Sequence, residues 1–215
     1  MIIKLLTLEN VPSTSSKLIM VKFDIILASA SPRRKTILSQ VGLDFTIIAS
    51  EINEDFSIEL QPKAFCEHWA REKANNIAKS HSDKLIIGAD TIVIINDKIL
   101  GKPKNYKESF AMLKSLSGKT HQVLTGVSLI HFNLGIDFTF TEYTDVSICF
   151  LTDEEINKYI NKYKPYDKAG SYGIQDGFSN YVERINGCFY NVMGFPISRF
   201  HKFYKSIKIG DKLID

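Results

Sequence analysis

The chain has 215 residues, of which 44% are hydrophobic and 24% charged, a composition typical of folded globular proteins that excludes fibrous and disordered classes. Lysine and arginine number 27 against 24 acidic residues, and this net charge of +3 is too small for the strong electrostatic footprint of a duplex-binding protein. No apolar run reaches the roughly 18 residues that a membrane span needs, so we expect a soluble protein.

The first 19 residues carry one short apolar patch, which Lys4, Glu9 and Pro12 interrupt. They lack the continuous apolar region and small-residue cleavage site of a secretory signal, so we expect a cytoplasmic protein. The first strong strand pattern follows Met20. We therefore interpret residues 1–19 as an extension without an assigned role and residues 20–215 as a single domain.

Short β-branched runs alternate with amphipathic helices in the first half of the chain. Strands are predicted at residues 23–29, 45–49, 85–95 and 98–100, and helices at residues 32–41 and 62–79. The first helix should begin at Ser31-Pro32, an N-cap followed by proline, and end at Gly42 with Val41 on its buried face.

The second half begins with a helix and then two long strands. Asn105 and Thr152 each precede a glutamate by three residues, the capping-box spacing that starts a helix. Two antiparallel strands are predicted at residues 121–132 and 136–150, with Phe150 on the apolar face of the second. Short strands are expected near Ser171, Val182 and Phe189, and a last helix from Pro196. Together these elements predict a mixed α/β fold.

A possible anion site lies where the first strand meets the first helix. Ser29, Ser31, Arg33 and Arg34 crowd this junction. The N–H groups and dipole of a helix N-terminus attract anions, and arginine forks suit phosphate oxygens. An ordinary Ser-Pro cap with two solvated arginines is an equally good interpretation of this stretch alone.

Asp90 and Thr91 interrupt a strand that is otherwise suited to burial. An unpaired buried carboxylate costs several kcal/mol, so Asp90 should meet a cation, a metal or an opening at a strand end. An aspartate that satisfies a backbone turn is the alternative, but the β-branched residues on both sides favour a site.

Weaker candidates are Lys102 in a Gly-Lys-Pro turn and Gln175 in the glycine-rich residues 167–177. Lys102 could neutralise phosphate and Gln175 could read a base edge, although each segment alone is typical of a solvated loop. Glu54 and Lys73 are, by themselves, typical of solvated surface charges. The phosphate-loop and Rossmann spacings are both absent from the sequence.

Several motifs occur in an order that we recognise: LASASPRR, AREKA, GADTIVI, ILGKP, LSGKTHQVLTGV, DKAGSYGIQ and NGCFYNVMGFP. Through them the chain closely resembles the Maf family of nucleoside triphosphate pyrophosphatases. The resemblance implies a two-lobed fold with a central twisted mixed sheet and a cleft, similar to inosine triphosphate pyrophosphatases. It also implies hydrolysis of a nucleoside triphosphate to the monophosphate and diphosphate with Mg²⁺ or Mn²⁺, and it is compatible with a homodimer.

The resemblance also assigns roles to residues. Asp90 would be the proton acceptor for the attacking water, and Glu54 with Asp90 would hold the divalent metal cation. The groups that would neutralise the triphosphate are Ser29, Arg33, Arg34, Lys73 and Lys102. Arg33, Thr91 and Gln175 stand at positions linked to substrate choice, in the combination of the branch that acts on dTTP and UTP rather than 7-methyl-GTP. One departure is Asp176, which separates Gln175 from Gly177 where the family pattern continues Ile-Gln-Gly, so modified pyrimidines stay open as substrates.

Two other classes of function stay open at this point. A regulatory binding protein in cell-division arrest is a role associated with the family, although no residue speaks for it directly. A nucleic-acid-binding protein is suggested only by Arg33-Arg34 and the slight positive charge, and we expect no nucleic-acid partner.

Overall fold

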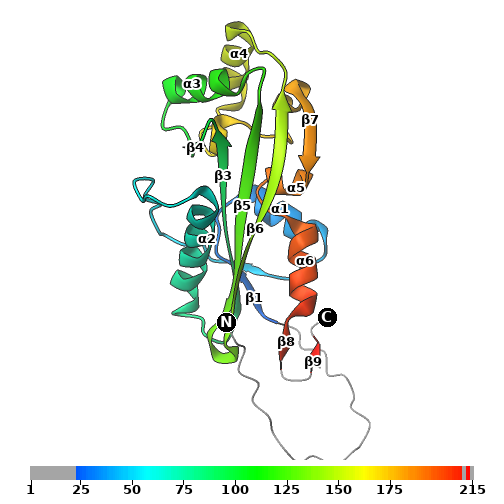
Figure 1. The fold of residues 1–215 in the computed structure, drawn as a ribbon. Coiled ribbons are helices and arrows are strands. Elements are labelled where there is room, and N and C mark those ends of the chain that lie inside the picture. The colour runs from blue at the N-terminus through cyan, green and yellow to red at the C-terminus, as the bar shows by residue number, and fades with distance from the viewer. Residues whose placement is uncertain (1–22, 210–211, 214–215) are drawn as a thin grey trace, which may run out of the picture.

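A computed structural model describes residues 23–209 and 212–213, so the predicted extension of residues 1–19 lies outside the described residues. In this described part, a seven-stranded sheet runs through the molecule and helices cover it on both faces (Figure 1). Its strands are β1 (Ile25–Leu27), β2 (Thr46–Ile47), β3 (Leu85–Ile95), β4 (Lys98–Leu100), β5 (Thr120–His131), β6 (Ile136–Ile148) and β7 (Val182–Gly187). A separate two-stranded pair, β8 (Lys208–Ile209) and β9 (Lys212–Leu213), follows near the end of the chain.

The sheet is mixed, with strand order β2-β1-β3-β5-β6-β7. Strand β1 pairs in parallel with β2 and β3, whereas the β3-β5, β5-β6 and β6-β7 pairs are antiparallel. The long β5-β6 pair spans nearly the whole height of the molecule in Figure 1. This architecture confirms the predicted mixed α/β class with a central mixed sheet.

Strand β3 has an open edge in its middle. On that edge it pairs with β1 as far as Ile87 and with β4 only from Val93 onward. Residues 88–92 between these points therefore have a strand neighbour on the β5 side alone. The polar residues of the β3 sequence fall within this open stretch.

Helices divide the molecule into two lobes that share the long strands. The helices of the described residues are α1 (Pro32–Gln40), α2 (Pro62–Ala78), α3 (Tyr106–Leu116), α4 (Asp153–Tyr163), α5 (Phe189–Val192) and α6 (Ile197–Ser206). Neighbouring side chains of β3 point to opposite faces of the sheet. In one lobe, Ile86 therefore packs with Ala74 of α2 on one face, and Ile87 packs with Phe200 of α6 on the other. In the other lobe, α3 and α4 cover the far ends of β3, β5 and β6.

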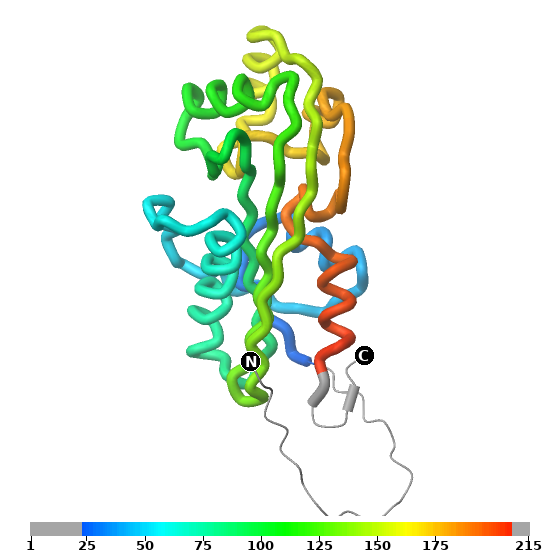
Figure 2. The backbone as a smooth tube through the Cα atoms, viewed as in Figure 1, coloured from blue at the N-terminus to red at the C-terminus, as the bar shows by residue number. Residues whose placement is uncertain are grey.

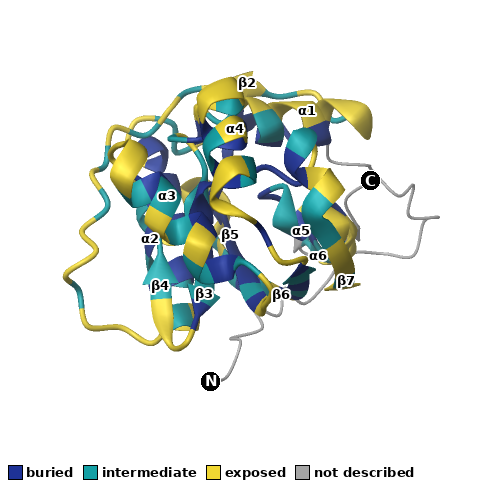
Figure 3. Cartoon of the chain, turned by 90° about the horizontal axis from the view of Figure 1, so that it is seen from above, coloured by how far each residue is buried: buried dark blue, intermediate teal, exposed yellow. Residues whose placement is uncertain are grey.

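The buried residues lie mainly in the sheet and on the helix faces that pack against it. Seen from above in Figure 3, the strands β3 and β5 are mostly buried, and exposed residues gather on loops and on the outer faces of helices. Among the described residues, no helix combines the length and the apolar character that crossing a membrane requires.

The predicted helix starts are confirmed, but the predictions of two short strands are wrong. The segment near Ser171 is a 3₁₀ turn (Ala169–Ser171), because Gly170 and Ser171 have φ of 65° and 66°, in the left-handed region that breaks a strand. The segment at Phe189 is the short helix α5, whereas the strand at Val182 is confirmed as β7.

Two apolar residues are exposed rather than buried as predicted. Val41 is 56% exposed because it is the C-cap of α1, where the chain leaves the helix. Phe150 is 74% exposed because β6 ends at Ile148, so the alternating pattern stops before Phe150.

Candidate active site

A cavity of about 440 Å³ opens beside the unpaired stretch of β3, within the roughly 300–1,000 Å³ typical of ligand pockets. Both lobes line it, because the β1-α1 junction comes from one lobe and residues 167–175 come from the other. All the predicted site residues line this one cavity: Ser29, Arg33, Arg34, Glu54, Lys73, Asp90, Thr91, Lys102 and Gln175. In the tube of Figure 2, the blue segment that contains α1 lies beside the orange segment near α5. Residues of both segments line the cavity.

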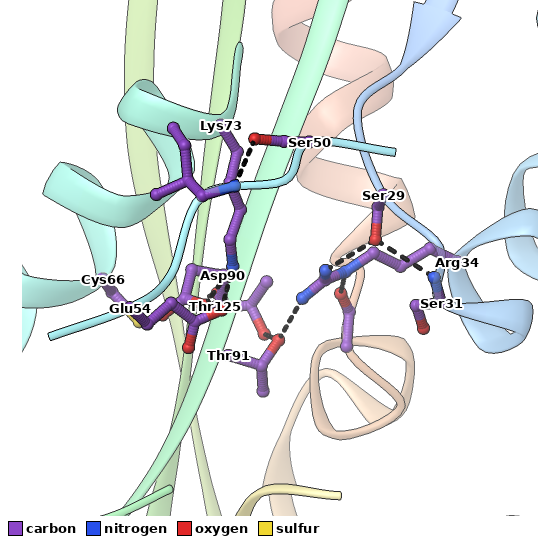
Figure 4. A network of polar contacts seen from close by, with 12 residues as sticks. Ser29, Ser31, Arg34, Ser50, Glu54, Cys66, Lys73, Asp90, Thr91 and Thr125 are labelled. Atoms are coloured by element: carbon purple, nitrogen blue, oxygen red, sulfur yellow. Dashed lines mark hydrogen bonds and ion pairs between the residues drawn. The ribbon is translucent and has the colours of Figure 1, made fainter. Parts of the chain in front are cut away.

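Asp90 belongs to an ion-pair cluster that is centred on Lys73. The Asp90 side chain is almost fully buried, and its Oδ1 accepts a hydrogen bond from Lys73 Nζ at 2.7 Å. The same ammonium lies 2.5 Å from Glu54 Oε1, so Lys73 joins two carboxylates (Figure 4). The sequence predicted that Asp90 would meet a cation or a strand opening, and the structure shows both.

Close packing of α2 on the sheet places Lys73 at this position. Gly88 of β3 lies so close to α2 that an added Cβ would be 2.1 Å from the carbonyl oxygen of Ala70. Gly126 of β5 makes a similar approach to the Cys66 carbonyl oxygen, at 2.5 Å. Because α2 comes this close, its side chains reach the strand that carries Asp90.

The charges of this cluster perturb its neighbours. Burial alone would raise the pKa of Glu54, but the ion pair with Lys73 and the positive charges of Lys102 and Arg34 lower it overall. Burial, together with the negative charge of Asp90, raises the pKa of Cys66 well above its ordinary value. Cys66 is therefore a neutral buried thiol and not a nucleophile.

Arg34 is a buried cation with only neutral partners among the described residues. Its Nε donates to the Gly194 carbonyl oxygen at 2.9 Å, Nη1 to Ser29 Oγ at 3.0 Å and Nη2 to Thr91 Oγ1 at 3.0 Å. Burial lowers its pKa, and the negative charge of Asp90 opposes this shift. Because a guanidinium has five N–H donors, two remain to bind an anion in the cavity.

A chain of hydroxyl groups fixes Arg34. Thr125 donates its only hydroxyl hydrogen to the Asn191 carbonyl oxygen at 3.1 Å. The Thr91 hydroxyl, 3.0 Å from that of Thr125, must then donate to it, and Thr91 accepts from Arg34. Thr91 and Asp90 point to opposite sides of β3, as neighbouring strand residues do (Figure 4).

The start of α1 offers further donors. Ser31 is the N-cap residue of α1 and Pro32 follows it in the first turn, as predicted, but the Ser31 side chain makes no capping hydrogen bond. The first-turn N–H groups of α1 therefore receive no hydrogen bond acceptor from Ser31, and they lie at the positive end of the helix, which attracts anions.

Arg33 has an acidic partner that sequence analysis did not identify. Its Nη1 lies 2.6 Å from Asp167 Oδ2, and Lys168 lies 2.7 Å from the other oxygen of the same carboxylate. Hydrogen bonds from Lys168 and Arg33 lower the pKa of Asp167 although partial burial opposes them. The motif DKAGSYGIQ contained both residues, but no local spacing linked either to Arg33.

The cavity is positively charged overall. Five cations and three carboxylates line it, a formal charge of +2. A cavity that offers this charge, arginine forks and an open helix N-terminus is suited to a polyanion such as a chain of phosphates.

Residues 24–207 match the family model described as Maf-like protein. The chain belongs to this family. A dTTP/UTP pyrophosphatase from Bacillus cereus is 46% identical over 185 residues, which cover 86% of this chain and 96% of that protein. A protein of the same name from Bacillus anthracis has the same identity and coverage. Among solved structures, the Ham1 protein of Staphylococcus aureus is a distant likeness, 18% identical with a TM-score of 0.41, over 58% of this chain and 71% of that one.

Proposed function

We propose that this Maf-like protein is a nucleoside triphosphate pyrophosphatase that hydrolyses dTTP and UTP to the monophosphate and diphosphate. This activity would limit the incorporation of non-standard nucleotides. The observation that carries the proposal is the buried Asp90 carboxylate on an open strand edge, in a cavity whose other charges are mostly cationic. The 46% identity to proteins named dTTP/UTP pyrophosphatase supports the choice of substrate.

In this proposal Asp90 acts as the proton acceptor for a water molecule. The water oxygen bonds to the α-phosphorus while its proton passes to Asp90, and the bond from the α-phosphorus to the bridging oxygen breaks, so that diphosphate leaves. Lys73 lies beside this carboxylate, with its ammonium 2.7 Å from Asp90 Oδ1.

The cations stabilise the charge that builds up on the phosphates. Arg34 offers its two remaining N–H donors from a fixed position, because three hydrogen bonds hold its guanidinium. Arg33 would exchange its contact with Asp167 for phosphate, and Lys102, which is exposed, would add a point charge from the other lobe. Groups positioned before the reaction are effective because little reorganisation is then needed.

Glu54 and Asp90 would hold the divalent cation. Maf-type nucleotide pyrophosphatases depend on a metal in general, and the described residues contain no group of three or more His, Cys, Asp or Glu that could hold one. Two carboxylates still fit Mg²⁺ or Mn²⁺, since such ions often bind one or two carboxylates together with substrate phosphates. A bound cation would supply charge neutralisation at the phosphates.

The lobe that contains residues 167–175 would recognise the base. Gln175 is exposed in the cavity wall, and its side-chain amide can both donate to and accept from a pyrimidine edge. Arg33 and Thr91, at the remaining positions linked to substrate choice, would act from α1 and β3. Thr91 would do so by holding Arg34, since its hydroxyl hydrogen is committed to Thr125.

A triphosphate panel with product identification tests the function. We expect dTTP and UTP to give monophosphate and diphosphate with Mg²⁺ or Mn²⁺, and ¹⁸O from labelled water to enter the monophosphate. Release of orthophosphate with a nucleoside diphosphate would refute the proposal. As a control we would use Lys114→Gln, which removes an exposed ion pair with Asp153 outside the cavity, and we expect it to give the same products as wild type.

Other sequence predictions enter the proposal as expectations. We expect a cytoplasmic enzyme that forms a homodimer and has no nucleic-acid partner, with residues 20–215 folding as one domain. Fractionation, light scattering and salt-dependent gel-shift experiments test these expectations.

A further inference from the structure

The loop that carries Gln175 is fixed by a buried tyrosine from α4. Tyr159, only 4% exposed, accepts a hydrogen bond from the Gly173 backbone N–H at 3.1 Å. Its hydroxyl lies 3.2 Å from both carboxylate oxygens of Asp176. One hydroxyl therefore holds residues 173 and 176, on either side of the residue proposed to contact the base.

The direction of these hydrogen bonds is determined by chemistry. The Gly173 N–H can only donate, so the Tyr159 oxygen accepts from it and donates its own hydrogen to the Asp176 carboxylate. Burial, together with the negative charge of Asp176, raises the pKa of Tyr159, so the hydroxyl keeps its hydrogen. Asp176 also accepts from the Phe178 backbone N–H at 3.0 Å, which continues the connection beyond the loop.

The packing leaves this loop little freedom. A Cβ added at Gly173 would lie 2.5 Å from Asp176 Oδ2 and 2.9 Å from Lys168 Cε. The Asp176 N–H donates to the Gly173 carbonyl oxygen at 3.2 Å, closing a tight turn around the exposed Gln175. Ile174, inside the same turn, is buried in the core below α4.

Asp176 is also where this chain departs from the Ile-Gln-Gly pattern. We propose that Tyr159 and Asp176 are positioning residues for Gln175, and that they set how tightly the cavity binds a pyrimidine base without contacting the phosphates. The inference rests on the proposed function, because it assumes that Gln175 contacts the base. Neither Tyr159 nor Asp176 lines the cavity, so any effect on binding must pass through the loop.

The test separates base binding from phosphate binding. We would measure inhibition constants for UMP, which has the base and one phosphate, and for inorganic tripolyphosphate, which has no base. In Tyr159→Phe and Asp176→Ala, we expect the UMP constant and the KM for UTP to rise about tenfold, as for one lost hydrogen bond of about 1.4 kcal/mol. The tripolyphosphate constant and kcat should stay within about twofold of wild type, the scatter normal for such constants.

Two variants serve as controls. Asp176→Asn keeps an oxygen that can accept from Tyr159 and Phe178, so it should restore most of the UMP affinity that Asp176→Ala loses. Tyr163→Phe makes the same substitution on the same helix, at a ring that stacks on Tyr159 at 5.1 Å. Its hydroxyl has no hydrogen bond among the described residues, so this variant should match wild type.

Different outcomes contradict the two proposals separately. If both inhibitors weaken equally, or if UMP binding is unchanged in Tyr159→Phe and Asp176→Ala, the positioning role is wrong. A wild-type enzyme that cleaves all triphosphates without regard to the base would also overturn it, while leaving the pyrophosphatase activity intact. A wild-type protein that binds UMP but cleaves no triphosphate would instead refute the proposed function.

Discussion

Replacing His121 by glutamine should make the stability of the protein less sensitive to acid. His121 lies in β5, is 3% exposed, and its Nε2 lies 2.8 Å from the hydroxyl of Tyr172, a residue of the cavity wall. Burial lowers its pKa to about 4, although the charge of Asp145 opposes the shift. The imidazole therefore stays neutral in the folded protein under conditions in which the unfolded chain binds a proton.

The size of the effect follows from this difference in proton binding. The unfolded histidine titrates near pH 6.5, so the stability that His121 contributes is complete above that pH and is lost as the pH falls toward 4. Each pH unit within this window costs about 1.36 kcal/mol. Going from pH 7 to pH 5 crosses about 1.5 units of the window, so the loss assigned to His121 is about 2 kcal/mol.

Urea unfolding at pH 7 and pH 5 measures this difference. His121→Gln removes the titrating group and keeps an amide beside Tyr172, so between the two pH values the variant should lose about 2 kcal/mol less than wild type does. His201→Gln, on the exposed face of α6, should behave as wild type. Equal losses in His121→Gln and wild type would show that the folded protein protonates His121 as readily as the unfolded chain does, and the reasoning would fail.

Three further predictions concern the site. Gly88→Ala should destabilise the protein by at least about 1–3 kcal/mol in urea unfolding and reduce turnover, because the new Cβ would push α2 and Lys73 away from β3; unchanged stability would contradict the close approach. Arg34→Met should lose most of the stabilisation by tripolyphosphate, about 2.7 kcal/mol for wild type at 100 times Kd, and an unchanged thermal shift would exclude Arg34 from phosphate binding. Asp90→Asn should still bind UMP while kcat falls by about 10²–10⁴, and an unimpaired rate would remove Asp90 as the proton acceptor.

Helix starts were predictable from the sequence because their causes are local. The Asn105 side chain accepts from the Glu108 N–H at 3.0 Å, and Thr152 with Glu155 forms a complete capping box. These contacts span three residues, so spacing alone identifies them. The strand expected near Ser171 is absent because Gly170 and Ser171 have a left-handed backbone, and the Gly170 N–H donates to the carbonyl oxygen of Gly101, far away in the sequence.

The partners within the site could not be predicted from spacing. Burial of Asp90 was foreseen from its apolar neighbours, but its pairing with Lys73 depends on the close approach of α2 to Gly88. The carboxylate that holds Arg33 is 134 residues away in the sequence. Tyr159 gave no signal at all, because on its own helix it appears only as one more core residue.

The pairing gap in β3 explains why a long buried strand can carry this chemistry. Strand β1 ends before Asp90 and Thr91 and β4 begins after them, so this stretch of β3 has a neighbouring strand on one side alone. The β5 ladder keeps this stretch extended, so the two side chains must point to opposite faces. Asp90 consequently meets Lys73, while Thr91 holds Arg34. The extended backbone of β3 thus separates Asp90, the proposed proton acceptor, from Thr91 and Arg34, which we propose to act on the phosphate side.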